Sequence, residues 1–254
     1  MEYQEFYIDC DGIKLHAKLD FPEGAEGKMP LMIVIHGFTG HMEEPHIIAA
    51  AKTANEVGFA ALRVEMYGHG KSDGAFRDHT LLKWLTNALS VVDYAKSLDF
   101  VTDLYLCGHS QGGLLTMLVA AMEEDVLKAV IPLSPAWMIP DGARAGDLLG
   151  GPFDPDHIPD ELSTDDWTLS GNYVRAARLI HPEDSFHRFT KPVLIVHGDQ
   201  DEAVPVRYAY DAAENYKDAK LVIIEGDDHC YTSHLDQVTL AIKEFLEEVS
   251  KDLA

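Results

Sequence analysis

Ser110 occupies the centre of a motif that is typical of nucleophilic catalysis. The pentapeptide at 108–112 reads Gly-His-Ser-Gln-Gly and fits the pattern G-x-S-x-G. It directly follows an apolar run at 104–107 and precedes a helix-like run at 113–122. A strand, a tight turn and a helix in this order expose a serine hydroxyl above the edge of a sheet. We therefore predict that Ser110 is a catalytic nucleophile.

Two later segments carry the groups that a serine nucleophile needs. A serine hydroxyl is activated by a base, and the base must be oriented by a carboxylate. The apolar run at 193–196 leads into Gly-Asp-Gln-Asp at 198–201, and the run at 221–224 leads into Gly-Asp-Asp-His at 226–229. Both segments follow expected strands, where open α/β sheets place their functional groups. The order along the chain is thus serine, acid, histidine.

Short apolar runs alternate with helical patterns along the chain. Residues 6–19 are typical of a hairpin that turns at Asp11 and Gly12. Helical periodicity is clear at 81–92 and at 235–249. The continuous apolar run at 31–35 is typical of a strand buried on both faces, and further short runs lie at 60–64, 104–107, 129–133, 193–196 and 221–224. This alternation predicts an α/β fold with a mostly parallel eight-stranded sheet and helices on both faces.

A segment rich in proline, glycine and aspartate interrupts the alternation after the sixth strand. It covers 135–182 and contains one short helical candidate at 173–180. Its apolar and aromatic side chains favour an ordered structure over a linker, and long irregular segments in compact domains are often functional. We expect a small inserted cap at 135–182 over the active site, with the core formed by 1–134 and 183–254.

The balance of charges excludes several classes of partner. Among 254 residues 43 are acidic and 20 basic, which gives a net charge of −23. Such a surface repels phosphate backbones and anionic lipid, so we expect neither nucleic acid nor a membrane as partner. The three cysteines and the histidines lack the spacing of a disulfide framework or a metal site, so we expect no metal and no cofactor. The cysteine usage and the polar opening residues favour a cytoplasmic location.

In its motifs and their order the chain resembles the α/β-hydrolases of the serine-esterase type over nearly its whole length. In that family the acid ends a G-x-x-D motif and the histidine ends a G-x-x-H motif. The resemblance therefore implies Asp201 as the acid and His229 as the base, with Asp199 as the rival acid in the same loop. The base would deprotonate Ser110 for attack on an ester carbonyl.

The tetrahedral intermediate of such a reaction needs backbone donors for its oxyanion. The segment at 36–40, His-Gly-Phe-Thr-Gly, matches the H-G-x-x-G loop of the same family. This match implies that the backbone amide of Phe38 is one donor of the oxyanion hole. The second donor is the amide of Gln111, which directly follows the nucleophile.

Four segments resemble the bacterial feruloyl or cinnamoyl esterases more closely, at 8–15, 66–74, 154–160 and 225–230. In that family the inserted cap holds the aromatic ring of the acyl group. Asp141 and Tyr173 match positions that bind the para-hydroxyl of the phenolic acid, although a solvated turn aspartate and a packed tyrosine would explain them too. Trp137 and Trp167 could line an aromatic slot, or pack within the cap.

The resemblance implies a serine ester hydrolase that cleaves feruloyl, coumaroyl or caffeoyl esters through an acyl-enzyme intermediate. The expected partner is a small phenolic ester or a feruloylated oligosaccharide, and a homodimer is compatible with the family. The alternatives are a general short-chain carboxylesterase, a monoacylglycerol lipase and a non-catalytic receptor with the same fold. The expected cap is acidic, whereas lipase caps present apolar faces to lipid; the aspartates that make it so are Asp147, Asp154, Asp156, Asp160, Asp165 and Asp166.

Overall fold

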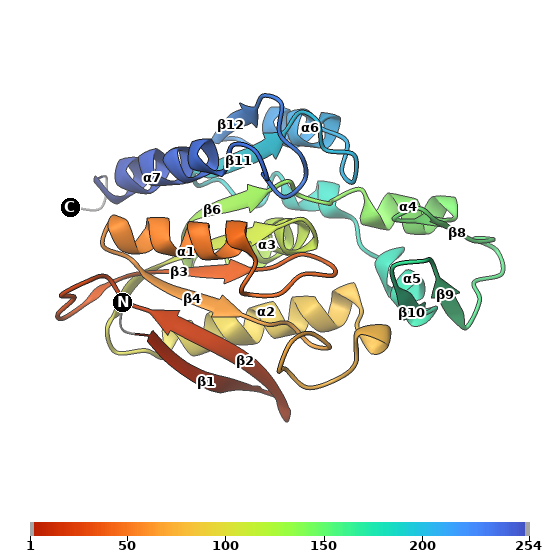
Figure 1. Ribbon diagram of the computed structural model, residues 1–254, viewed down its shortest axis with the longest axis horizontal. Coiled ribbons are helices and arrows are strands. Elements are labelled where there is room, and N and C mark those ends of the chain that lie inside the picture. The colour runs from red at the N-terminus through yellow and green to blue at the C-terminus, as the bar shows by residue number, and fades with distance from the viewer. Residues whose placement is uncertain (1–2, 252–254) are drawn as a thin grey trace.

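A central sheet of eight strands organises the molecule, for which the computed structural model describes residues 3–251 (Figure 1). Its strands are β1 (Tyr3–Cys10), β2 (Ile13–Asp20), β3 (Met29–Ile35), β4 (Ala60–Val64), β5 (Val101–His109), β6 (Leu127–Leu133), β11 (Val193–Gly198) and β12 (Ala219–Ile224). Their order across the sheet is β1-β2-β4-β3-β5-β6-β11-β12. Strand β2 runs antiparallel to β1 and β4, and the other neighbours are parallel. The predicted mostly parallel eight-stranded sheet is confirmed.

Helices cover both faces of this sheet (Figure 1). They are α1 (Pro45–Glu56) and α7 (Leu235–Lys251) on one face, and α2 (Leu81–Lys96), α3 (Gln111–Met122) and α6 (Arg207–Asn215) on the other. Successive side chains of a strand point to opposite faces. In β3, Met32 and Val34 pack with the first helix layer, whereas Leu31, Ile33 and Ile35 pack with the second. Burial on both faces explains why this strand is apolar throughout.

The chain between β6 and β11 forms a separate group of short elements beyond one end of the sheet (Figure 1). It contains α4 (Ile139–Ala145), the hairpin β7 (Asp147–Leu148) and β8 (Gly151–Pro152), the hairpin β9 (Glu161–Ser163) and β10 (Thr168–Ser170), α5 (Asn172–Ala177) and the 3₁₀ helix η2 (Pro182–Ser185). Another 3₁₀ helix, η1 (Phe76–Asp78), precedes α2.

The sequence prediction for this segment was incomplete. It placed one short helix at 173–180 in otherwise irregular chain, whereas the structure has two helices and two hairpins, and α5 ends at residue 177. Elements this short carry no clear periodicity and depend on tertiary packing. Leu148, Leu162 and Leu169 are buried in one apolar cluster with Phe38 and Leu114 of the main body. The division into core and cap at residues 135 and 182 stays a prediction.

The helices of the described part, residues 3–251, include none that is long and apolar enough to cross a membrane.

Candidate active site

Ser110 lies on a strained turn between β5 and α3. Its φ angle is 56°, in the left-handed region that non-glycine residues rarely adopt. The two glycines of the motif allow this turn because a Cβ at Gly108 would lie 2.2 Å from the carbonyl oxygen of Gly112. A Cβ at Gly112 would lie 2.5 Å from the carbonyl oxygens of Ile35 and His36. The local sequence therefore permits the sharp turn that exposes the serine.

The loops after β11 and β12 bring a carboxylate to a histidine. Nδ1 of His229 lies 2.6 Å from Oδ2 of Asp201. The other carboxylate oxygen accepts hydrogen bonds from the backbone amides of Ala203 and Val204. Burial raises the pKa of Asp201, but hydrogen bonds from His197 and His229 lower it more strongly, and the result lies well below the usual range. Asp201 is therefore ionised at neutral pH and suited to orient an imidazolium.

The two aspartates that the sequence left as rivals have different partners. Oδ1 of Asp199 accepts a hydrogen bond of 2.7 Å from the backbone amide of Gly226. It thus ties together the loops that follow β11 and β12. The structure brings Asp201, and not Asp199, to His229.

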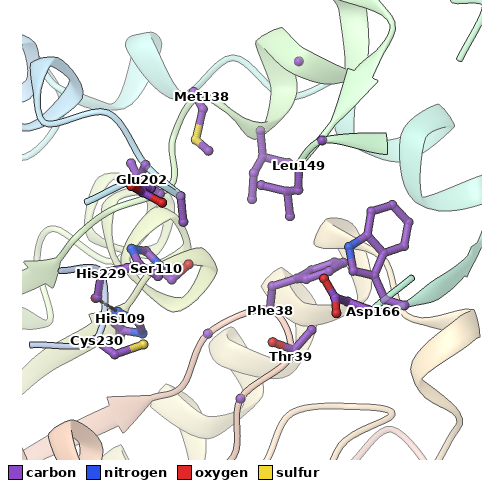
Figure 2. A pocket seen from close by; sticks show the side chains of 18 of the residues that line it. Phe38, Thr39, His109, Ser110, Met138, Leu149, Asp166, Glu202, His229 and Cys230 are labelled. Atoms are coloured by element: carbon purple, nitrogen blue, oxygen red, sulfur yellow. Dashed lines mark hydrogen bonds between the residues drawn. The ribbon is translucent and has the colours of Figure 1, made fainter. Parts of the chain in front are cut away.

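Ser110 and His229 line one pocket of about 700 Å³ (Figure 2). Phe38, on the loop after β3, lines the same pocket, and its carbonyl oxygen lies 2.7 Å from Nε2 of His69. Gln111 is the first residue of α3, where backbone amides have no partner within the helix. The predicted nucleophile, base and oxyanion-loop residue therefore meet at one cavity, beside the positive end of a helix.

The side chain of Gln111 is linked to the segment between β6 and β11. Its Oε1 accepts a hydrogen bond of 2.5 Å from the hydroxyl of Tyr173 on α5. Both side chains are fully buried. Tyr173 therefore contacts the residue after the nucleophile, and it does not line the pocket.

Of the other predicted substrate contacts, Trp167 lines the pocket, whereas Asp141 and Trp137 do not. Trp167 lines it, and its ring meets that of Phe38 edge-on at 5.7 Å between centroids. Asp141 does not line it; its side chain is 56% exposed and pairs with Arg144 at 2.6 Å. Trp137 packs outside the pocket too, and its indole donates to the carbonyl oxygen of Tyr208.

Known proteins resemble this chain in sequence and in structure. Residues 28–151 match the family model described as serine aminopeptidase, S33, and residues 168–252 match that of TAP-like proteins. The structure of Est1E from Butyrivibrio proteoclasticus with ferulic acid bound is 63% identical in sequence, with a TM-score of 0.96. The match covers 97% of this chain and 99% of Est1E.

The chain belongs to the α/β-hydrolase family. It is an ester hydrolase of the serine type, as the similarity to Est1E and the S33 match indicate. Human protein ABHD12B is 26% identical over 86% of this hydrolase and 61% of its own length, so the hydrolase spans less than two thirds of that relative. Human palmitoyl-protein thioesterase ABHD10 is 24% identical over 80% of the hydrolase and 68% of its own length.

The pocket of this hydrolase combines apolar walls with an acidic border. Its larger apolar side chains are Phe38, Met138, Ile139, Leu149, Trp167 and Val204. Its carboxylates are Glu44, Asp147, Asp166 and Glu202, and lysine and arginine do not occur among the lining residues. Burial raises the pKa of Glu44. The pocket therefore suits a neutral, partly aromatic substrate better than an anion.

Sequence reasoning did not assign several of these lining residues. Glu202 and Cys230 directly follow the predicted acid and base, so their positions next to the motifs could have indicated them. Asp147, Leu149 and Asp166 come from the short hairpins between β6 and β11. These three lie in no motif, and only the folded arrangement brings them to the pocket.

Proposed function

We propose that this hydrolase cleaves esters of hydroxycinnamic acids, with feruloyl, coumaroyl and caffeoyl groups as the acyl class. The observation that carries this proposal is the similarity to Est1E, whose structure holds ferulic acid and of whose chain 99% aligns with this one at 63% identity. The substrate would be a small phenolic ester or a feruloylated oligosaccharide. Residues 135–182 would form the cap that covers the acyl group.

The positions of the side chains that line the pocket support an aromatic acyl group. Phe38, Leu149 and Asp166 lie on the side away from His229, whereas Glu202 and Cys230 lie close to it (Figure 2). The leaving oxygen of an ester must take its proton from the base, so the alcohol belongs on the His229 side. The acyl chain then points towards the apolar side.

This arrangement changes the expected contact of the phenol. Asp141 and Tyr173 do not line the pocket, whereas the exposed Asp147 and Asp166 do, and Asp166 lies on the side of Phe38 and Leu149 (Figure 2). A phenol hydroxyl next to apolar walls is penalised unless it finds an acceptor. We assign that acceptor to the carboxylate of Asp166, which neighbours Trp167 in the chain.

The proposed reaction has two stages. His229 takes the proton of Ser110 as the serine oxygen attacks the ester carbonyl, and Asp201 stabilises the resulting imidazolium. The backbone amides of Phe38 and Gln111 hold the oxyanion, and the alcohol leaves with the proton from His229. Water then attacks the acyl-enzyme with His229 as base again, which releases the hydroxycinnamate and restores Ser110.

The test compares kcat/KM for methyl ferulate, its para-methoxy analogue and 4-nitrophenyl butyrate. We expect methyl ferulate to be preferred, and Asp166→Asn to reduce the preference for the free phenol about tenfold, the scale of one hydrogen bond to a charged group. Asp141→Asn is the matched control because that carboxylate pairs with Arg144 outside the pocket. Preference for butyrate, unchanged by Asp166→Asn, would contradict the acyl class and favour a general carboxylesterase. Ser110→Ala must abolish hydrolysis of all three esters.

A further inference from the structure

His109 contacts the proposed base, and no step of the reaction above uses it. We propose that His109 is a positioning residue that holds the loop after β12 in place, so that His229 stays within reach of Ser110. Nε2 of His109 lies 2.7 Å from the backbone carbonyl oxygen of His229, across 120 positions of the chain. The proposal rests on the assignment of Ser110 and His229 above, and it does not depend on the identity of the acyl group.

The contact defines which nitrogen of His109 carries the proton. A carbonyl oxygen only accepts, so Nε2 donates. The ring is 3% exposed, and burial lowers the pKa of His109 well below its usual value, so the ring is neutral. Its single proton therefore lies on Nε2, and the buried Nδ1 has no hydrogen-bond partner among residues 3–251. This neutral donor adds no positive charge beside His229 when that residue becomes an imidazolium.

The topology of the sheet explains why such a contact is useful. His109 is the last residue of β5 and directly precedes Ser110, whereas His229 follows the edge strand β12. Three strand spacings separate β5 from β12, which is about 14 Å across the sheet. Asp227 of the His229 loop bonds within the loop, to the amides of Ser233 and His234. Tyr231 ties the loop to β11 and to the chain after β6, through the carbonyl oxygen of Val196 and the hydroxyl of Ser134. The contact from His109 ties the loop to the strand that ends at the nucleophile.

The ring of His109 is held between two other imidazoles. Its centroid lies 4.1 Å from that of His46 on α1 and 4.6 Å from that of His229. On the oxyanion loop, a Cβ at Gly37 would lie 3.3 Å from Nδ1 of His109. A ring packed this closely on several sides has little rotational freedom, so it can hold a hydrogen-bond direction.

Loss of this contact should act on the chemical step and not on substrate binding. The proton transfer between Ser110 and His229 requires the two groups in one geometry, and a misplacement of about 1 Å costs up to about 100-fold in rate. The acyl group lies on the opposite side of the pocket in the proposed mode. We therefore expect kcat to fall while KM stays nearly constant.

Three substitutions separate the hydrogen bond from the packing. His109→Gln keeps an N–H close to the position of Nε2, His109→Met has a similar length without a donor, and His109→Phe keeps a ring without a donor. With 4-nitrophenyl acetate we expect the Gln variant to stay within about threefold of wild-type kcat, and the Met and Phe variants to lose about tenfold or more. KM should change less than about twofold in all three. Melting temperatures show which variants are folded.

Equal kcat values for the Gln, Met and Phe variants would overturn the proposal, because packing alone would then explain His109. Ser110→Ala and His229→Ala serve as controls, since retained activity in either would instead overturn the assignment of the nucleophile or the base.

A second test of the hydrogen bond uses the wild-type protein, so it does not depend on whether a variant folds. Nitrogen NMR of labelled histidine must show His109 neutral with its proton on Nε2 at neutral pH, and a proton on Nδ1 would refute the contact.

Discussion

Asp201 meets two imidazoles through a single carboxylate oxygen, with Oδ2 at 2.6 Å from Nδ1 of His229 and 3.0 Å from Nε2 of His197. The side chains of Asp201 and His197 are fully buried, whereas that of His229 is 20% exposed. One imidazole thus supports the carboxylate from the protein interior, and the other faces the pocket. A carboxylate held in this way stays ionised and orients the exposed imidazole without itself becoming protonated.

We expect Asp201→Asn to lower kcat/KM about 1,000- to 10,000-fold, because an amide at this position favours the wrong tautomer of the base. Asp199→Asn is the matched control from the same loop. Its Oδ1 accepts from the amide of Gly226, and an asparagine oxygen can still accept there. The control should stay within about threefold of wild type in steady-state hydrolysis. A large loss in Asp199→Asn with a small loss in Asp201→Asn would reverse the assignment.

Tyr173→Phe should lower the free energy of unfolding, and it should lower kcat/KM by the same factor for all esters. The change leaves Oε1 of Gln111 without its donor in a fully buried place, which costs about 1–3 kcal/mol in the free energy of unfolding. Because Gln111 also supplies the proposed oxyanion amide, kcat/KM should fall by a common factor for methyl ferulate and 4-nitrophenyl butyrate. Urea unfolding and the two rate ratios measure this, with the exposed Tyr210→Phe as control. A loss confined to substrates with a free phenol would instead place Tyr173 on the substrate.

Acidification below pH 6.5 should destabilise the fold through buried neutral histidines. Burial lowers the pKa of His36 and His79 to about 3 and that of His46 to about 4. The unfolded chain takes up protons near pH 6.5 and the folded chain does not, so the free energy of unfolding falls as pH falls from 6.5 towards 4. The slope should be about 1 kcal/mol per pH unit for each histidine below pH 6.

Urea unfolding at pH 7, 6 and 5 measures this slope. His46→Leu should reduce the slope by about a fifth, since burial also lowers the pKa of His36, His69, His79 and His109. Stability that is constant between pH 7 and 5 would contradict neutral burial of these rings.

Cys230 is the cysteine that thiol reagents should reach in the folded hydrolase. It is exposed and lines the pocket beside His229, whereas Cys10 and Cys107 are buried. Partial burial and the charges of Glu44 and Asp228 raise its pKa to about 11. The thiolate fraction at pH 8 is therefore about 100-fold lower than for an ordinary cysteine, but a thiolate of higher pKa is also the stronger nucleophile, so labelling should be about tenfold slower.

Iodoacetamide labelling followed by mass spectrometry and an ester assay checks this expectation. One label at Cys230 should accompany the loss of hydrolysis because the adduct fills the pocket next to the base. Cys230→Ser should stay active after the same treatment. Loss of activity in that variant would place the sensitive group elsewhere.

Local patterns were enough to predict the framework of the fold and the motifs of the site. The apolar runs at 31–35 and 104–107 became central strands, because a strand buried on both faces needs an unbroken apolar sequence. The glycines around Ser110 are a local requirement of its strained turn, and they are readable without any contact from elsewhere. A catalytic residue whose position depends on a local turn can thus be predicted from the sequence around it.

Contacts between distant segments decided the rest. Asp199 and Asp201 stand two positions apart, and only the packing of the β11 and β12 loops directs one to Gly226 and the other to His229. Asp141 and Tyr173 lie on helices too short to show which face is buried, and folding turned one to Arg144 and the other to Gln111. The orientation of a short element depends on side chains far away in the chain, so it follows from tertiary packing and not from local pattern.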